Sequence, residues 1–513
     1  MPLSHPLPRR QALQHLARLA TALAGAPSLG AWAQSTSPSE LRTNDAALAD
    51  TWRALSRLGY GPTPGLLREV RAASSPRDWA LQQPSLAWKE SQLPPVLDEA
   101  QEAMQAPLPH IFAGVQRERQ ARAARKAGAD PAPGSNDATP LDLAIAPEPQ
   151  DYTRSLVAKT AAWRLQACSL PQQENLLLAR MTEFWFNHLN VYIGKGAVRP
   201  FVGHYLVHAV RAHALGRFED LLLASARHPA MLHYLDQAQS VANGTRGAQG
   251  QTRGLNENYA RELMELHTLG VDGGYTQTDV RDLARVLTGW TIDPRSNDGF
   301  RFAMRLHDSG GKTVLSHSYP EGLFNRGEAE GEAAIRMLAH QPQTARRLSL
   351  RLAQFFVADQ PSPTLVQRLS QVFMQAQGEI RPWLQALLQS PEFWDPANRL
   401  FKTPMDFACS ALAATQGITE RRHLPLTLGF LNNAGQPLHG WQTPDGYKTD
   451  AATWLVPEAL TRRADYALAL GRQAPDLDYL LPFLGRATRD TLAQQKPALR
   501  AGLLLASPEF MYK

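Results

Sequence analysis

The spacing of apolar residues along the chain is mostly that of amphipathic helices. Trp52, Leu55 and Leu58 recur at three-residue intervals, so they mark the buried stripe of a first helix. The same periodicity predicts further helices over residues 156–168, 172–192, 201–215, 218–227, 256–269, 278–288, 330–340, 344–357, 363–375, 380–389, 403–415, 458–472 and 488–505. The predicted fold class is therefore mainly α, with one large multi-helix domain.

Alternating strand patterns are scarce. The best examples are residues 299–306 and 313–315, which predict at most a short β-hairpin near 299–315. Thr276 and Asp279 form the sequence pattern of a capping box before the helix at 278–288, and Gly289 is expected to cap that helix at its C-terminal end.

The first 33 residues have the features of a signal peptide. Arg9 and Arg10 precede a weakly apolar stretch, and residues 31–33 have the small-x-small pattern of a cleavage site, so we expect export by the twin-arginine route. The alternative is an amphipathic first helix, which Pro27 would break. Residues 34–48 are predicted to be a flexible leader, and residues 49–513 a single helical domain.

A proline-rich stretch at 127–150 interrupts the predicted helices. It holds five prolines together with Gly and Asp, so we expect a surface excursion. Nowhere does the sequence contain the 18 to 20 continuous apolar residues, roughly, that a membrane-spanning helix needs. No integral membrane segment is therefore expected after removal of the signal.

Composition excludes disorder and coiled coil, because 43% of the 513 residues are hydrophobic and only 19% are charged. The formal charge is +6, from 53 basic and 47 acidic residues. Removing the three arginines of the signal leaves 50 against 47, or +3. The basic run at 117–126 is interpreted as a solvated helix end, so no nucleic-acid partner is expected. Two cysteines, Cys168 and Cys409, are too few for a disulfide scaffold, and their spacing leaves open whether they pair.

The densest polar group lies at 256–267. On a helix, Glu257, Arg261 and Glu265 would share one face. The functional interpretation makes Glu262 a general base or metal ligand, positioned by Asn258 and Arg261. The structural alternative is a helix capped by Asn256 that carries an ordinary ion pair.

Histidines offer further candidate chemistry. His188 lies on an apolar helix face, where burial favours the neutral imidazole that binds metals or accepts a proton, although such a histidine is more often a core residue. His204 and His208 have the i, i+4 spacing of a zinc-binding pair, but no Glu follows His204 as a metalloprotease motif requires.

A second loop combines titratable residues with glycines. His307, Asp308 and Lys312 flank two glycines after a predicted strand, an arrangement that suits either a site or a polar turn.

Several segments resemble the bacterial domain-of-unknown-function 1800 family. The main one is NENYARELMELHTLGVDGGYTQTDVRDLARVLTGW at 256–290. Others are RLGYGPTPG at 57–65, FWFNHLNV at 184–191, HPAMLHYLDQAQS at 228–240, HDSGGKTVL at 307–315, HQPQTARRLSLRL at 340–352 and GQPLHGWQTPDGY at 435–447. The resemblance implies α-helical architecture and export, and a genomic neighbour similar to the phosphatase and sulfatase superfamily. It supplies no established catalytic residues.

Two hypotheses follow from the sequence. The first is a periplasmic or secreted hydrolase of an extracellular phosphate, sulfate or glycan-type substrate. Its candidate catalytic residues are His188, Glu262, His307 and Asp308, and its candidate substrate-binding residues are Asn258, Arg261 and Lys312. No cofactor is identified; a divalent metal is one candidate, with His188, Glu262 and His307 as its candidate ligands. The second hypothesis is a non-catalytic protein that binds surface polysaccharide or works with an exported phosphatase- or sulfatase-like partner. An aromatic-rich groove with dispersed polar residues would favour binding, and a compact His/Glu/Asp cluster would favour catalysis.

Overall fold

The computed structural model describes residues 43–97, 101–127, 149–246, 252–321, 327–417, 423–472 and 474–513. The expected signal at 1–33, most of the expected leader and residues 128–148 of the proline-rich stretch lie outside these ranges. Residues 43–48, expected to belong to the leader, form the start of the first described helix. Residues 49–513 form one compact unit.

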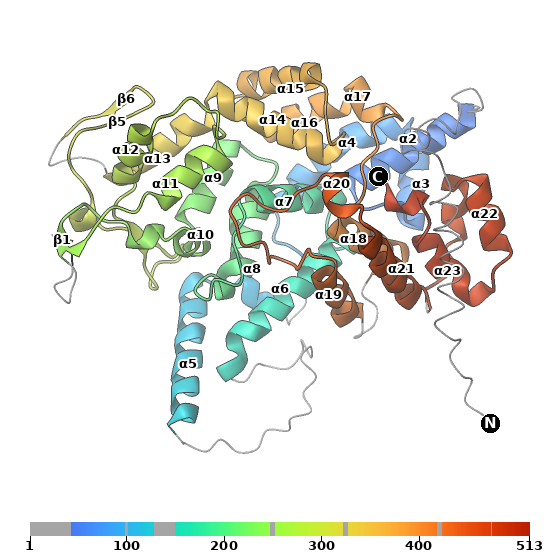
Figure 1. Cartoon of the computed structure of the whole chain (residues 1–513), viewed down its shortest axis with the longest axis horizontal. Helices are drawn as coiled ribbons and strands as arrows, with labels where there is room; N and C mark the ends of the chain where they lie inside the picture. Colours follow the sequence, from blue (N-terminus) through green and yellow to red (C-terminus); the bar gives the residue numbers. More distant parts are fainter. Residues whose placement is uncertain are drawn as a thin grey trace. The chain divides into compact units, whose positions relative to one another are not determined.

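The α-helices confirm the mainly α prediction (Figure 1). They are α2 (Thr43–Leu58), α3 (Pro64–Ala72), α4 (Pro76–Ser91), α5 (Leu108–Lys126), α6 (Tyr152–Ser169), α7 (Leu176–His188), α8 (Val202–His204), α9 (Phe218–Arg227), α10 (Pro229–Tyr234), α11 (Asn258–Glu262), α12 (Gln277–Val286), α13 (Gly327–Ala339), α14 (Pro342–Phe356), α15 (Pro363–Gln375), α16 (Ile380–Leu388), α17 (Pro391–Trp394), α18 (Pro404–Ala414), α19 (His423–Asn433), α20 (Ala451–Trp454), α21 (Pro457–Gly471), α22 (Arg486–Ala493) and α23 (Pro497–Leu505).

Short helical turns join many of these helices. The 3-10 turns are η2 (Glu102–Met104), η3 (Pro149–Asp151), η4 (Arg199–Phe201), η6 (Arg211–His213), η7 (Gln237–Gln239), η9 (Met304–Leu306), η10 (Asp478–Phe483) and η11 (Glu509–Met511). Two π-helical turns, η5 (Tyr205–Val210) and η8 (Leu263–His267), extend α8 and α11. The helices expected at 201–215 and 256–269 therefore exist, but each changes its winding partway.

The described strands are short and antiparallel. They are β1 (Thr245–Arg246), β2 (Thr252–Arg253), β3 (Trp290–Ile292), β4 (Phe300–Phe302), β5 (Lys312–Val314) and β6 (His317–Tyr319). Both segments of the expected hairpin contain a strand, but β4 pairs with β3 and β5 pairs with β6. The register runs Trp290 to Phe302 in the first pair and Lys312 to Tyr319 in the second.

Side-chain caps fix several helix ends. In the predicted capping box of α12, the Asp279 amide donates to Thr276 Oγ1 at 3.2 Å, and the Thr276 amide donates to Asp279 Oδ2 at 2.8 Å. Gly289, expected to cap α12, has a φ of 84°, which disfavours a side chain. The single helix expected at 488–505 is instead two helices, because Pro497 begins α23 and cannot continue the preceding ladder of hydrogen bonds.

Helices that are close to one another in the sequence pack together in two places (Figure 1). α21 contacts α19 and α23, whereas α12 contacts α11, α13 and β5. The close approach of α21 to α23 depends on two glycines, because a Cβ on Gly471 would lie 2.4 Å from the Gly502 nitrogen. Among the described helices, none combines the length and the apolar character that crossing a bilayer would require.

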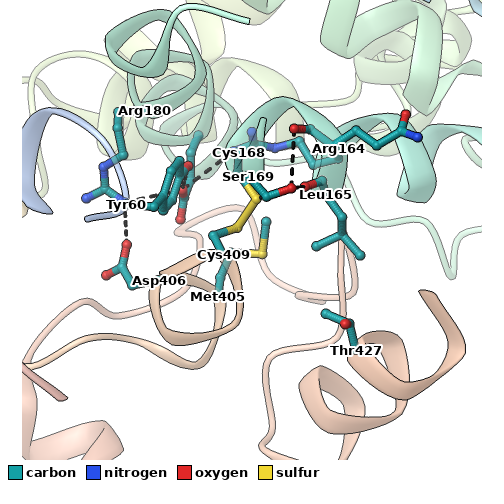
Figure 2. The surroundings of a disulfide bond; sticks show 12 residues. Tyr60, Arg164, Leu165, Cys168, Ser169, Arg180, Met405, Asp406, Cys409 and Thr427 are labelled. Carbon is teal, nitrogen blue, oxygen red and sulfur yellow. Dashed lines mark hydrogen bonds and ion pairs between the residues drawn. A yellow bond between two sulfur atoms is a disulfide. The ribbon is translucent and has the colours of Figure 1, made fainter. Parts of the chain in front are cut away.

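A disulfide joins α6 to α18 and resolves the pairing that the sequence left open. Cys168 is bonded to Cys409, and their Cα atoms are 5.6 Å apart (Figure 2). Both cysteines are fully buried, so the bond crosses the hydrophobic core rather than the surface.

Candidate functional site

His307 and Lys312, predicted to share a loop site, do lie together, in a buried network with Glu330 of α13. His307 Nδ1 donates to the Thr288 carbonyl at 2.9 Å, which leaves Nε2 facing Lys312 Nζ at 3.4 Å. Lys312 Nζ donates to Glu330 Oε1 at 2.7 Å, and the side chains of Lys312 and Glu330 are 0% and 4% exposed. Burial would raise the pKa of Glu330, but the hydrogen bond from Lys312 and the close approach of His307, 3.6 Å away, outweigh it and lower that pKa. Each charged group in this network therefore has a partner inside the protein.

Asp308 lies beside this network and binds α12. Arg285 Nε and Nη2 donate to the two Asp308 carboxylate oxygens at 2.9 and 3.2 Å, and the Gly310 amide donates to Oδ1 at 3.0 Å. Burial would raise the pKa of Asp308, but the bonds from Arg285 and Gly310 lower it. The ionised carboxylate thus anchors the loop at 307–311 to α12.

His188 is a core residue at the end of α7. Its Nε2 donates to the His267 carbonyl at 3.0 Å, and its ring packs edge-on against Trp185 at 5.8 Å between centroids. Burial, followed by the nearby Arg351, lowers the pKa of His188 well below its usual value. The neutral imidazole expected from the sequence is therefore favoured, in an apolar environment.

The helix at 258–267 carries the predicted charged face. Arg261 lies 3.4 Å from Glu257 Oε2 and 3.6 Å from Glu265 Oε1, as the i, i+4 spacing predicted. The N-cap residue of α11 is Glu257 and not Asn256 as expected, although Asn256 Oδ1 accepts the first helical amide, that of Asn258, at 2.9 Å; Asn258 Nδ2 donates to the Leu235 carbonyl at 3.3 Å. The ion pairs agree with the structural alternative.

Glu262 differs from its neighbours on this helix. It is half-buried, and burial, with Glu265 and Asp445 nearby, raises its pKa against the opposing effect of Arg261. Tyr234 lies close enough for Glu262 to raise the pKa of the phenol in turn, after the larger effect of burial. Of the two candidate catalytic acids, Glu262 and Asp308, Glu262 is the one whose pKa is raised.

The candidate residues form three sets of contacts. His307, Asp308 and Lys312 are together, and Asn258, Arg261 and Glu262 share the helix at 258–267, whereas His188 contacts aromatic rings and His267 at the end of that helix. These three sets of contacts have no residue in common. Within the described ranges, no three His, Cys, Asp or Glu side chains are grouped so that they could hold a metal ion.

The pair His204 and His208 is also engaged internally. The Ala230 amide donates to His228 Nδ1 at 3.1 Å, so His228 carries its proton on Nε2 and donates it to His204 Nδ1 at 3.0 Å. Burial, with a smaller effect of His208, lowers the pKa of His204 to about 3. The pair joins α8 to the start of α10 through His228.

A groove of about 1110 Å³ lies between α5, the start of α6, residues 193–201 and residues 292–295. We call it the arginine groove, because five exposed arginines line it: Arg119, Arg122, Arg154, Arg199 and Arg295. The lining includes one acid, Glu118, which binds Arg122 at 2.6 Å and the Thr153 amide at 3.2 Å.

Arg119, Arg154 and Arg295 have no side-chain partner within the part of the chain that is described. The groove is therefore basic and has three cationic side chains available to a ligand.

Aromatic rings add apolar surface to the arginine groove. The rings of Phe112 and Phe201 are tilted against each other with centroids 4.7 Å apart, and His233 stacks on Phe201 at 6.0 Å. Gly114 permits the wall between α5 and α6, because a Cβ there would lie 2.2 Å from the Tyr152 ring. The groove can accordingly bind both the charged groups and the apolar faces of a ligand.

Sequence reasoning missed this groove. The basic run at 117–126 is exposed, as expected, but Arg119 and Arg122 within it also form one wall. The remaining arginines come from segments far away in the chain, so no local motif marks them. The basic run at 117–126, which lies on one helix, was the only local feature of the sequence that could have indicated the groove.

Comparison with known proteins gives one match. The family described as "Protein of unknown function (DUF1800)" matches residues 53–512. No curated protein and no solved structure matches the chain. The matched region includes every described element from α3 to η11. The chain therefore belongs to the DUF1800 family.

Proposed function

We propose that the protein is exported and binds an anionic extracellular polysaccharide in the arginine groove, without catalysing a reaction there. The observation that carries this proposal is the combination of five arginines and one internally bound acid around a groove of about 1110 Å³. Arginine binds carboxylate, phosphate and sulfate groups through paired hydrogen bonds, so repeated acidic groups of a polymer suit this lining.

The size and openness of the site favour a polymer over a small molecule. Pockets for small ligands occupy roughly 300–1,000 Å³ and bury most of the ligand, with a few polar groups. Here all five arginines are exposed, and they are spread over four segments. The dispersed positions of the other candidate polar residues also favour binding over a single catalytic cluster.

A polysaccharide suits the expected compartment better than a nucleic acid does. The N-terminal segment is predicted to direct export, and the buried Cys168–Cys409 disulfide is typical of oxidising compartments outside the cytoplasm. In the periplasm or outside the cell, acidic sugars are a common polyanion. The proposed exported phosphatase- or sulfatase-like partner would modify such a polymer.

The test compares two triple variants of the mature protein. Binding of a polyuronate oligosaccharide and of a neutral glucan is measured by calorimetry for the wild type, for R119A/R154A/R295A and for the matched control R68A/R71A/R489A. The control removes three exposed arginines outside the groove. At about 0.5 kcal/mol per exposed contact, the groove variant should bind polyuronate roughly tenfold more weakly, and the control should not.

Two outcomes would overturn the proposal. Equal losses in the two triple variants would mean that only the total charge matters. Equal or tighter binding of single-stranded DNA in the same groove would replace the polysaccharide by a nucleic acid, because both ligands use arginines and aromatic rings.

A second candidate function is hydrolysis at Glu262, as the sequence suggested. What supports it is that burial, Glu265 and Asp445 raise the pKa of this half-buried carboxyl, which is the direction in which a carboxyl is adjusted for work as a general acid. The test is release of phosphate, sulfate or reducing sugar by the wild type and by E262Q. Hydrolysis that E262Q retains would exclude Glu262, and no hydrolysis by the wild type would leave binding as the function.

A further inference from the structure

A second, much smaller cavity lies away from the arginine groove. It has a volume of about 60 Å³ and is lined by side chains of α6, α7 and α14, the start of α18 and residues 436–449. Its polar lining includes Arg164, Glu183, Asn187, His439 and Thr449. None of these residues lines the arginine groove, so the two sites are independent.

Arg164 is buried with part of its hydrogen-bonding capacity unused. The residue is 3% exposed, and its Nη1 has no hydrogen-bond partner within the described part of the chain. Its Nη2 lies 3.5 Å from Glu183 Oε2, an oxygen that also accepts the Tyr60 hydroxyl at 2.6 Å and faces Arg180 at 3.5 Å. Figure 2 shows Arg164, Tyr60 and Arg180 around the disulfide. Glu183 is thus shared among three donors and neutralises Arg164 only in part.

His439 supplies a second unused buried nitrogen on the same cavity. It is 6% exposed, its ring packs edge-on against Phe186 at 4.8 Å, and its Nε2 has no partner within the described ranges. Its φ of 56° is left-handed, a conformation that a non-glycine residue adopts at some cost. Burial, followed by the charge of Arg164, lowers the pKa of His439 to about 3. With a neutral imidazole and a proton on Nε2, His439 can donate to a ligand.

Two other lining residues, Asn187 and Tyr447, are held by paired hydrogen bonds. Asn187 Nδ2 donates to the Tyr447 carbonyl at 2.8 Å, and the Tyr447 amide donates to Asn187 Oδ1 at 2.7 Å. The Tyr447 hydroxyl donates to the Pro437 carbonyl at 2.6 Å, which holds the segment that carries His439. The cavity is therefore built by side chains whose positions are determined before any ligand enters.

Buried charge around the cavity is predominantly positive. Arg180 and Lys513 both bind Asp406, and Lys513 Nζ lies 2.5 Å from Asp406 Oδ2. Lys402 is 1% exposed, and its Nζ has no hydrogen-bond partner in the described structure. With Arg164 and Arg463, four buried cations lie near two carboxylates, Glu183 and Asp406, while burial lowers the pKa of Lys402 well below its usual value. Buried charges are costly unless they are paired, so this region favours an additional anion and disfavours a metal ion.

We propose that the cavity between Arg164 and His439 binds a small tetrahedral oxyanion, phosphate or sulfate. A water molecule needs roughly 10–15 Å³ of such volume, so about 60 Å³ accommodates the four oxygens of one oxyanion. Arg164 Nη1 and His439 Nε2 would donate to it, and charge-assisted donors of this kind form the stronger hydrogen bonds. The Glu183 carboxylate also faces the cavity and remains bound to Tyr60, Arg164 and Arg180.

The experiment measures the thermal unfolding midpoint and the heat of binding with sodium phosphate, sodium sulfate or sodium chloride at equal ionic strength. The wild type should be stabilised by phosphate or by sulfate at millimolar concentration and not by chloride. Preference between the two oxyanions identifies which one the site selects. Stabilisation by neither oxyanion would overturn the proposal and leave the cavity to water.

Variants locate the effect. R164M should abolish oxyanion binding, and H439N should weaken it at least tenfold. Asparagine tolerates the left-handed backbone at position 439, so H439N is expected to fold. It therefore tests the site even if R164M does not fold. R119A/R154A/R295A should bind the oxyanion as the wild type does, which separates this site from the arginine groove. Equal affinity in H439N and the wild type would exclude His439 and contradict the proposed site.

Discussion

Cys168 of α6 is bonded to Cys409 of α18, and this link closes the chain across 241 residues within the core. We expect C168S/C409S to lower the free energy of unfolding by about 2–5 kcal/mol, because the link restricts the unfolded chain over a long loop. The measurement is urea unfolding of the wild type with and without reductant. Reductant should lower the stability of the wild type to that of the double variant and leave the double variant unchanged; equal stability of all samples would mean that the bond does not form in the protein.

Lys312 and Glu330 form a buried ion pair whose two members depend on each other. E330Q should lower the free energy of unfolding by about 3–5 kcal/mol, because it leaves the Lys312 ammonium buried without its counter-ion. K312M/E330L should recover most of that loss, since apolar residues of similar size remove both charges. Chemical unfolding of the three proteins tests this. An E330Q variant as stable as the wild type would show that the ammonium reaches water.

The same carboxylate predicts how stability depends on pH. The pKa of Glu330 is lowered in the folded protein, because His307 and Lys312 outweigh burial. The ionised carboxylate therefore stabilises the fold fully at pH values above its pKa in the unfolded chain, about 4.3. This stabilisation is lost as the pH falls through the lower pKa of the folded protein. Unfolding free energies at pH 7, 5, 4 and 3 should decrease toward acid. E330Q should flatten the part of this decrease below about pH 4; an identical slope in both proteins would assign it to other carboxylates.

Replacing His188 should destabilise the folded protein, because its ring is packed in the core. H188A should cost about 2–4 kcal/mol, because it leaves a cavity beside Trp185 and removes the donor to the buried His267 carbonyl. H188Q, which retains a donor of similar reach, should recover part of this loss. The comparison is by thermal and urea unfolding, and a fully stable H188A would argue against a structural role for His188.

Much of the fold could be predicted from local pattern alone. The helices at 218–227 and 363–375 coincide with α9 and α15, because apolar periodicity marks a long amphipathic helix reliably. The break before Pro497 and the π-helical turn at 263–267 were missed. The periodicity of apolar residues does not indicate how tightly a helix is wound. The pairing of β4 with β3 and of β5 with β6 was missed as well, because strand pairing depends on tertiary contacts.

The candidate sites were predictable only where partners are close in sequence. His307 and Lys312 are five residues apart and do meet, and Arg261 pairs with Glu257 and Glu265 through helical spacing. Glu330, the counter-ion of Lys312, comes from α13, whereas Lys312 lies on strand β5. The cavity at Arg164 and His439 has no local signal, and the arginine groove has only the basic run at 117–126, because the residues of both sites are assembled from distant segments.

The central claim is that the arginine groove binds an anionic polysaccharide. Hydrogen exchange of the mature protein, with and without a polyuronate oligosaccharide, tests it most directly by locating the ligand. We predict slower exchange in α5 around Arg119, in residues 193–201 and in residues 292–295, and weaker protection of these segments in R119A/R154A/R295A at a ligand concentration near the wild-type dissociation constant. Protection confined to other segments, or no protection at saturating ligand, would contradict the proposed function.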